Sequence, residues 1–233
     1  MKKYELTDEH LKLGTMTLYR IRALKDFSNV RCGEMGGYIQ CEENLSHDGD
    51  AWVFEDARVY GDARVFEDAW VSGDARVYGD ARVFEDARVF EDAWVSGDAR
   101  VSRNARVYGN AWAYGDARVY GDARVSGNAR VFEDARVCGD ARVFGDALVF
   151  GNALVSGNAW VKEVSDVVCI SPIGSENGIF TAYKQSNGSI GCNRGCFFGT
   201  LDEFQKAVEE THEGTKFFDE YMALINLVRL RLS

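Results

Sequence analysis

Apolar and polar positions alternate with a fixed period of six over residues 51 to 164. In each hexad an alanine and a valine are separated by one residue, as in "ARVYGDARVFEDAWVSGD" from Ala57 to Asp74. One-residue alternation is typical of a strand and does not fit the 3.6-residue helix. Each strand is followed by Gly-Asp, Gly-Asn or Glu-Asp, residues that favour turns. The pattern therefore predicts 19 short strands, each followed by a turn.

Three such strands make one triangular coil of 18 residues, and successive coils pair strand on strand at about 4.8 Å. The hexads continue from Ala51 to Ala159 without an insertion. We therefore expect a mainly β fold, a single-stranded parallel β-helix of about six coils, with alanine and valine inside.

The segments outside the hexads are expected to cover the two open ends of the solenoid, because bare coil edges would pair with other chains. Residues 1–50 are predicted to form an N-terminal cap, and residues 165–233 a small C-terminal α+β domain. Asn187 and Gly188 predict a hairpin turn. Thr200 and Glu203 form a capping box that starts a helix near Leu201.

The last predicted helix carries apolar residues at alternating spacings of three and four, which is typical of a coiled-coil seam. Three copies of this seam would hold a trimer together. In the alternative, this face packs on its own hairpin, because the helix has a second apolar face. The seam residues are Phe218, Tyr221, Ile225, Val228 and Leu232.

Length and charge limit the classes of function. The chain has 233 residues and a net charge of −10, which makes broad binding to nucleic acid or to an anionic membrane unlikely. The N-terminus lacks the apolar run of a signal peptide, and no stretch approaches the roughly 20 apolar residues of a membrane span. We therefore expect a cytoplasmic protein without a membrane partner.

The hexads resemble the hexapeptide-repeat family, whose members fold as left-handed parallel β-helices and commonly form trimers. Many of them are acyltransferases. The stretch "LYRIRALKDFSNVRCGEMGGYIQCEENLSHDGDAWV" (residues 18–53) is similar to the opening of acyltransferase-like proteins of the YdcK type. The tail "GCFFGTLDEFQKAVEETH" (residues 195–212) resembles a module of phage and prophage β-helix proteins. The resemblance implies a left-handed homotrimer, encoded by a phage or prophage and present in the host cytoplasm.

The resemblance also implies a histidine base for an acyltransferase. The three histidines, His10, His47 and His212, all lie outside the hexads, and no loop interrupts the coils. Cys192 and Cys196 have no second pair at zinc-binding spacing. We therefore expect no catalytic residue, no metal and no cofactor. An acyltransferase that uses a terminal histidine remains an alternative.

The second position of each hexad points outward, and stacking at 18 residues sorts these positions into three columns. One column is a ladder of arginines from Arg64 to Arg136, which the aspartates of the turns would neutralise. Where asparagine replaces aspartate in the upper coils, positive charge is left over, and a phosphate or carboxylate site is predicted. The candidate ligand-binding residues are Arg82, Arg100, Arg106, Arg118, Arg124 and Arg136.

Trp94 and Trp112 occupy consecutive rungs of another outward column and need a cover, so they are candidates for the oligomer interface. The sequence thus predicts a non-catalytic homotrimer that binds a host component or sequesters an anionic, nucleotide-like ligand in a counter-defence role. A host protein is the alternative partner. A structural spacer without a ligand is a further alternative.

Overall fold

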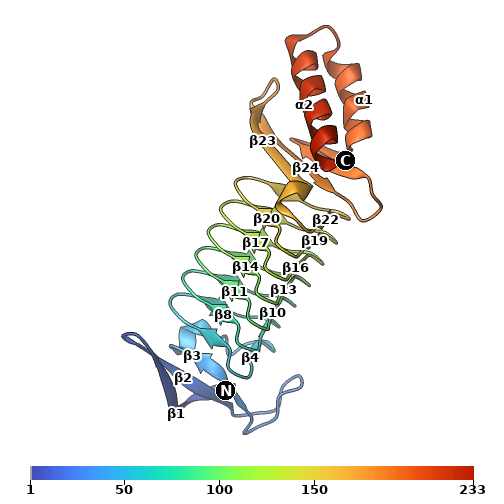
Figure 1. Cartoon of the computed structure of the whole chain (residues 1–233). Coiled ribbons are helices and arrows are strands. Elements are labelled where there is room, and N and C mark those ends of the chain that lie inside the picture. Colours follow the sequence, from blue (N-terminus) through green and yellow to red (C-terminus); the bar gives the residue numbers. More distant parts are fainter. Residues whose placement is uncertain (1) are drawn as a thin grey trace.

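A computed structural model describes residues 2–233 of the chain. Figure 1 shows an elongated solenoid with a sheet at one end and two helices at the other. The solenoid has three faces, which we number in chain order. Face 1 contains β4 (Trp52–Val53), β7 (Trp70–Val71), β10 (Arg88–Val89), β13 (Arg106–Val107), β16 (Arg124–Val125), β19 (Arg142–Val143) and β22 (Trp160–Val161).

Face 2 continues from the N-terminal sheet. It contains β5 (Arg58–Val59), β8 (Arg76–Val77), β11 (Trp94–Val95), β14 (Trp112–Ala113), β17 (Arg130–Val131) and β20 (Leu148–Val149). Face 3 contains β6 (Arg64–Val65), β9 (Arg82–Val83), β12 (Arg100–Val101), β15 (Arg118–Val119), β18 (Arg136–Val137) and β21 (Leu154–Val155). The predicted parallel β-solenoid is confirmed.

Each coil advances by 18 residues, as the hexads predict. Arg100 pairs in parallel with Arg118, and Val101 with Val119. The alanines and valines of the hexads are buried and form one continuous core. Burial of this repeated pair is the main stabilising contribution of each coil, because apolar area removed from water contributes about 25 cal/mol per Å².

The solenoid has about seven turns rather than the expected six. β3 (Met35–Ile39) pairs in parallel with β5, and Leu45 bridges to Val65 in the same direction. The short 3₁₀ helix η1 (Glu42–Asn44) connects these two places. Coil pairing thus begins before Ala51, in a segment without the hexad pattern.

The turns explain why glutamate replaces glycine in some hexads. Gly97 has φ +65°, and Glu91 adopts the same left-handed backbone with φ +61°. This conformation strains a residue that has a Cβ atom. The Glu91 carboxylate accepts a hydrogen bond from the Gly109 N–H one coil above at 2.8 Å. The bond offsets part of the strain, and equivalent bonds link Glu55 to Gly73, Glu67 to Glu85, and Glu133 to Gly151.

The N-terminal cap satisfies the carbonyl groups at the open edge of the first turn. β1 (Tyr4–Leu13) and β2 (Met16–Ala23) form an antiparallel pair that continues into β3. The buried Lys3 ammonium donates to the carbonyl of Ala51 at 2.8 Å, and the Tyr4 hydroxyl donates to that of Leu45 at 2.8 Å. Burial lowers the pKa of Lys3 to about 8. These side chains occupy the positions that another strand would take.

The C-terminal domain begins after the 3₁₀ helix η2 (Val164–Asp166). It is an antiparallel sheet of β23 (Val167–Ile173), β24 (Gly178–Lys184), β25 (Ile190–Arg194) and β26 (Phe197–Thr200), followed by α1 (Leu201–His212) and α2 (Lys216–Leu232). The predicted hairpin turn joins β24 to β25. The capping box is present, because the Glu203 N–H donates to the Thr200 hydroxyl and the Thr200 N–H donates to the Glu203 carboxylate.

This sheet covers the upper end of the solenoid. The Leu154 N–H donates to the Thr181 hydroxyl at 3.2 Å, and the Asn193 amide donates to the Leu154 carbonyl at 2.7 Å. Ser156 and Tyr183 share a buried hydrogen bond at 3.0 Å. Side chains therefore satisfy backbone groups at both ends of the solenoid.

The predicted trimer seam lies in the core of the C-terminal domain. Tyr221, Ile225, Val228 and Leu232 are buried there, and Phe218 packs against the same core. The structure thus follows the alternative in which this face of the helix packs on its own sheet. Leu227 and Leu230 are the exposed leucines of α2.

Candidate functional site

The arginine ladder of face 3 runs along the solenoid axis. The side chains of Arg82, Arg100, Arg118 and Arg136 are exposed, and each residue pairs with the next across neighbouring strands. Adjacent strands lie about 4.8 Å apart, which is less than the Debye length of about 8 Å at physiological salt. Their positive charges therefore act together on an approaching ligand.

These arginines do not form the direct ion pairs with the turn aspartates that would neutralise them most strongly. The ion pairs among residues 2–233 all lie in the terminal domains, for example Arg22 with Glu5 and Arg31 with Asp26. Between residues 58 and 142, each arginine is more than 4.0 Å from every described carboxylate oxygen. The reason is positional, because the arginines project from the strands while the aspartates lie in the turns. The expected pairing with the aspartate column is absent there.

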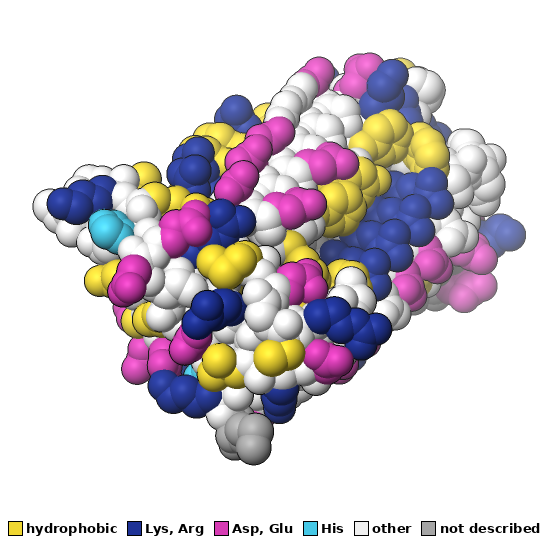
Figure 2. Space-filling view, turned by 90° about the horizontal axis from the view of Figure 1, so that it is seen from below, with side chains coloured by type: hydrophobic (Ala, Val, Ile, Leu, Met, Phe, Trp, Pro, Cys, Tyr) yellow, Lys and Arg dark blue, Asp and Glu magenta, His cyan; other side chains and the backbone are white. Residues whose placement is uncertain are grey.

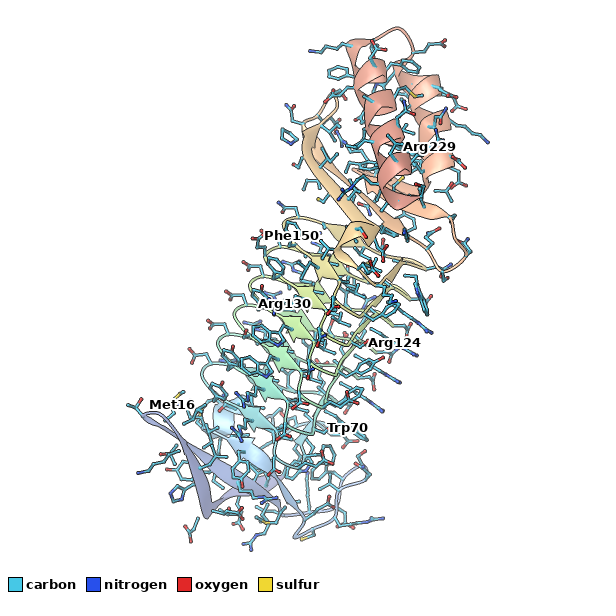
Figure 3. The ribbon with its side chains drawn as sticks, viewed as in Figure 1. Met16, Trp70, Arg124, Arg130, Phe150 and Arg229 are labelled. Carbon is cyan, nitrogen blue, oxygen red and sulfur yellow. The ribbon has the colours of Figure 1, made fainter. Side chains whose placement is uncertain are left out.

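A second arginine column lies on face 1. It consists of Arg88, Arg106, Arg124 and Arg142, with Trp70 and Trp160 at its two ends. Figure 3 shows Trp70 and Arg124 along the same side of the solenoid. Arg88 lies 4.7 Å from the ring centre of Trp70, and Arg142 lies 5.2 Å from that of Trp160. Arg124 is half-buried, unlike the other arginines of this column.

At the corner between faces 1 and 3, the turn that contains Arg103 carries no acidic residue. Residues 99–115 contain Arg100, Arg103 and Arg106 but no aspartate or glutamate. Arg103 lies in the turn between the two columns, 6.0 Å from the ring centre of Tyr120. Figure 2 shows lysine and arginine side chains gathered in a continuous strip along the solenoid. Arg103 was not among the predicted site residues, although it is the one arginine at a turn position of a hexad.

The two candidate interface tryptophans stack on each other on face 2. The rings of Trp94 and Trp112 lie 4.8 Å apart and almost parallel. Arg76 covers the outer face of Trp94 at 4.8 Å, and Arg130 covers that of Trp112 at 5.1 Å. Both tryptophans are half-buried. Much of the cover that they require therefore comes from their own chain.

The histidines lie at the two ends of the solenoid, outside the arginine columns, and His47 follows the segment that pairs with β6 at the lower end of face 3. His10 is exposed on β1. His47 stacks on Tyr4 with ring centres 4.3 Å apart and accepts a hydrogen bond from a backbone N–H. His212 ends α1 at the opposite end of the molecule, 5.2 Å from the ring of Tyr221 (Figure 1). An acyltransferase site that uses them would have to lie at one end of the solenoid.

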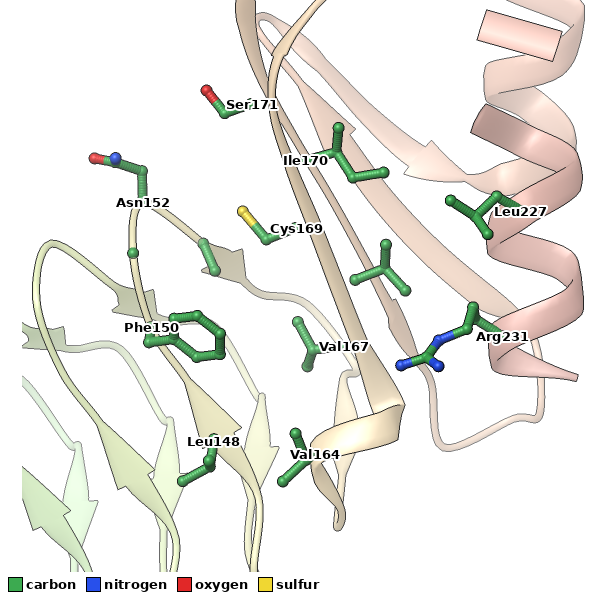
Figure 4. Close-up of a pocket in the computed structure, with 13 residues that line it drawn as sticks. Leu148, Phe150, Asn152, Val164, Val167, Cys169, Ile170, Ser171, Leu227 and Arg231 are labelled. Carbon is green, nitrogen blue, oxygen red and sulfur yellow. The ribbon is translucent and has the colours of Figure 1, made fainter. Parts of the chain in front are cut away.

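An open apolar pocket of about 680 Å³ lies where the solenoid meets the C-terminal domain. Figure 4 shows Phe150 and Leu148 of the last coils facing Val164 and Val167, with Arg231 of α2 nearby. Its described lining contains no histidine and no carboxylate. These side chains offer no acid–base pair for catalysis.

Two further properties concern the described part of the chain. Neither of its helices is long and apolar enough to cross a membrane. Within residues 2–233, no cluster of three or more histidines, cysteines or carboxylates has the geometry to hold a metal ion.

Comparison with known families agrees with this architecture. The family model described as the YdcK beta solenoid repeat matches residues 57–73, 75–91, 93–109, 117–133, 123–139 and 135–149. Residues 57–149 therefore contain β-solenoid repeats similar to those of the YdcK type. None of these matches includes residues 18–53 or 195–212. The resemblances of these two segments therefore stay predictions. A search of curated proteins found no match.

Proposed function

We propose that this β-solenoid is a non-catalytic binding protein whose two arginine columns hold an anionic ligand. The observation that carries the proposal is the lack of ion pairs along both columns within the described residues. Nine arginines, five on face 3 and four on face 1, have no ion-pair partner within 4.0 Å, and all but the half-buried Arg124 are exposed.

The chemistry of the side chain supports an oxyanion as the ligand. A guanidinium presents a planar set of donors that matches a phosphate or carboxylate, and charge-assisted hydrogen bonds are stronger than neutral ones. Rungs about 4.8 Å apart suit a ligand with several linked phosphates lying along the axis. A nucleotide or a short polyphosphate has this form.

The negative charge of the rest of the chain limits the size of the ligand that the arginine columns can bind. The whole chain carries a charge of −10, so that it repels extended polyanions at long range. A ligand with a few charges is therefore favoured over a long nucleic acid. The acid-free segment 99–115 marks the centre of the proposed site.

Assembly as a homotrimer and an origin in a phage or prophage stay part of this proposal. Sequestration of a host nucleotide would then be the role of the protein. A trimer would have to use surfaces other than the buried face of α2. The exposed side chains Phe150, Val164 and Leu227 at the junction pocket are candidates.

Calorimetric titration of inorganic tripolyphosphate and of ATP tests the proposal. In the variant Arg100→Ala/Arg118→Ala we expect at least a tenfold loss of affinity for both, because a hydrogen bond to a charged group contributes about 1.5–3 kcal/mol. The matched control is Arg22→Ala/Arg31→Ala, which removes the same charge from paired arginines outside the solenoid. Equal affinity in both double variants would refute the face 3 column as part of the site.

The acyltransferase alternative has a separate readout. If it holds, the wild type turns over acetyl-coenzyme A, and His47→Ala or His212→Ala abolishes this turnover. Under our proposal, the wild type shows none with any acceptor that binds.

A further inference from the structure

The fourth position of the hexads forms columns of aromatic rings at the corners of the solenoid. Between faces 1 and 2, the rings of Phe90 and Tyr108 stack 4.8 Å apart and nearly parallel. Phe144 belongs to the same column two coils above Tyr108. Ser126 lies on the coil between them, so the column lacks one ring at this place.

The small side chain of Ser126 leaves a cavity of about 190 Å³ that is open to solvent. A cavity of about 150 Å³ is large enough to hold benzene, so this one has the size for an aromatic ring. Two coil steps of about 4.8 Å separate Tyr108 from Phe144, and a ring inserted between them would lie about 4.8 Å from each. The cavity is lined by Tyr108, Arg124, Ser126, Arg142, Phe144 and Trp160.

Three other hexad serines also lie between aromatic residues of the coils above and below, but a large neighbouring side chain accompanies each. Trp70 and Trp94 lie on two of these coils and pack edge-on against the ring of the coil below, at 5.4 and 6.3 Å. Arg103 follows the third serine and reaches toward the Tyr120 ring. These three positions are Ser72, Ser96 and Ser102.

The rim of the cavity is positively charged. Arg124 and Arg142 both line it, and its described lining includes no carboxylate. At the neighbouring turn, Asn128 stands where other coils have aspartate, and its amide donates to Asp146 at 3.0 Å. Trp160 is 40% exposed and stands edge-on to Phe144 at 5.0 Å, which makes it an apolar wall.

We propose that this cavity is a binding slot for the base of a nucleotide, with the phosphate held by Arg124 and Arg142. The inserted base completes the aromatic column, since offset stacks with ring centres 4.5–7 Å apart are favourable. The inference rests on the proposed anion-binding function and adds the class of ligand, a nucleoside phosphate. It also gives Phe144 and Trp160 a role as walls of the slot, and Ser126 a role as the small residue that leaves room for the base.

Filling the slot is the sharpest test. Ser126→Phe places in the column the residue that Phe90 and Phe144 already show there, so we expect this variant to fold and to be at least as stable as the wild type. Ser126→Ala is the matched control, because it removes the hydroxyl and leaves the slot open. The probes are AMP, CMP, adenosine and inorganic phosphate, measured by saturation-transfer NMR of the base protons and by calorimetry.

We expect AMP or CMP to bind to the wild type and to Ser126→Ala, and to bind at least tenfold more weakly to Ser126→Phe. Adenosine and phosphate alone are expected to bind more weakly than AMP. Equal binding of the nucleotides by Ser126→Phe and the wild type would overturn the slot, and so would the absence of binding to the wild type.

The two proposals fail in different ways. Binding of tripolyphosphate by Arg100→Ala/Arg118→Ala at the wild-type affinity would refute the face 3 column, whereas binding of AMP by Ser126→Phe at the wild-type affinity would refute only the slot. The end of an oligonucleotide presents the same chemistry as a free nucleotide. Titration of a pentanucleotide beside AMP shows by their relative affinities whether the ligand is the end of an oligonucleotide or a free nucleotide. Whichever binds more tightly, we expect Ser126→Phe to weaken the binding of both.

Discussion

Gly97 offers a test of how the turns of the solenoid are stabilised. Its backbone has φ +65°, and a Cβ atom built on it would lie 3.0 Å from the Gly115 nitrogen of the coil above. Gly97→Ala therefore adds both left-handed strain and a close backbone contact. Gly97→Glu adds the same Cβ atom, but its carboxylate can accept the Gly115 N–H, as Glu91 accepts that of Gly109.

The expected magnitudes follow from these two contributions. The left-handed conformation costs an L-residue about 1–2 kcal/mol, and the contact adds to this. We expect Gly97→Ala to lower the free energy of unfolding by about 2 kcal/mol. A hydrogen bond to a charged acceptor contributes about 1.5–3 kcal/mol when protected and less in an exposed turn. We therefore expect Gly97→Glu to recover about 1 kcal/mol of the loss.

Urea unfolding followed by far-UV circular dichroism measures both variants. Gly188→Ala is the control for strain alone, because Gly188 has φ +82° and no heavy atom lies within 4 Å of its added Cβ. If Gly97→Glu is as unstable as Gly97→Ala, or more so, the carboxylate does not support the turn and the reasoning is wrong.

Three further predictions concern the core, the N-terminal cap and the C-terminal domain. Val83→Asp puts an unpaired charge into the buried column, and we expect a loss of several kcal/mol in urea unfolding; a loss below about 1 kcal/mol would contradict the packing. The pKa of Lys3 in the folded state, about 8, is below its usual 10.5, so the folded state loses this proton first and stability rises as pH increases from about 8 to 10.5. Lys3→Met should abolish this rise, and an equal rise in the variant would refute its assignment to Lys3. Ile225→Asp should unfold the C-terminal domain while the solenoid stays folded, as read by hydrogen exchange; native exchange rates in both helices would contradict the burial of Ile225.

The repeat made the solenoid predictable from sequence, because each hexad by itself predicts the same strand and the same turn. The first turn was missed for the converse reason. Its strand "MGGYI" at β3 has Gly37 where the hexads have alanine and Tyr38 where they have arginine or tryptophan, and only pairing with β5 shows that it belongs to the solenoid. Non-local pairing of this kind leaves no periodic signal.

The candidate site was predicted in part. The 18-residue spacing placed Arg100 beside Arg118 correctly. The sequence did not reveal that the turn aspartates form no ion pair with these arginines, because this depends on where each side chain projects. The seam residues of α2 were ambiguous, since a face with spacings of three and four packs equally well on a sheet or on another helix. Ser126 was visible as an exception to the aromatic pattern, but only the three-dimensional stacking shows that a cavity results.

The structure of the protein bound to ATP tests the central claim most directly. At an ATP concentration that saturates binding in calorimetry, the account predicts phosphate oxygens within hydrogen-bond distance of arginines in the two columns, with Arg100 or Arg118 of face 3 among them. Bound ATP whose phosphates contact neither arginine column would contradict it.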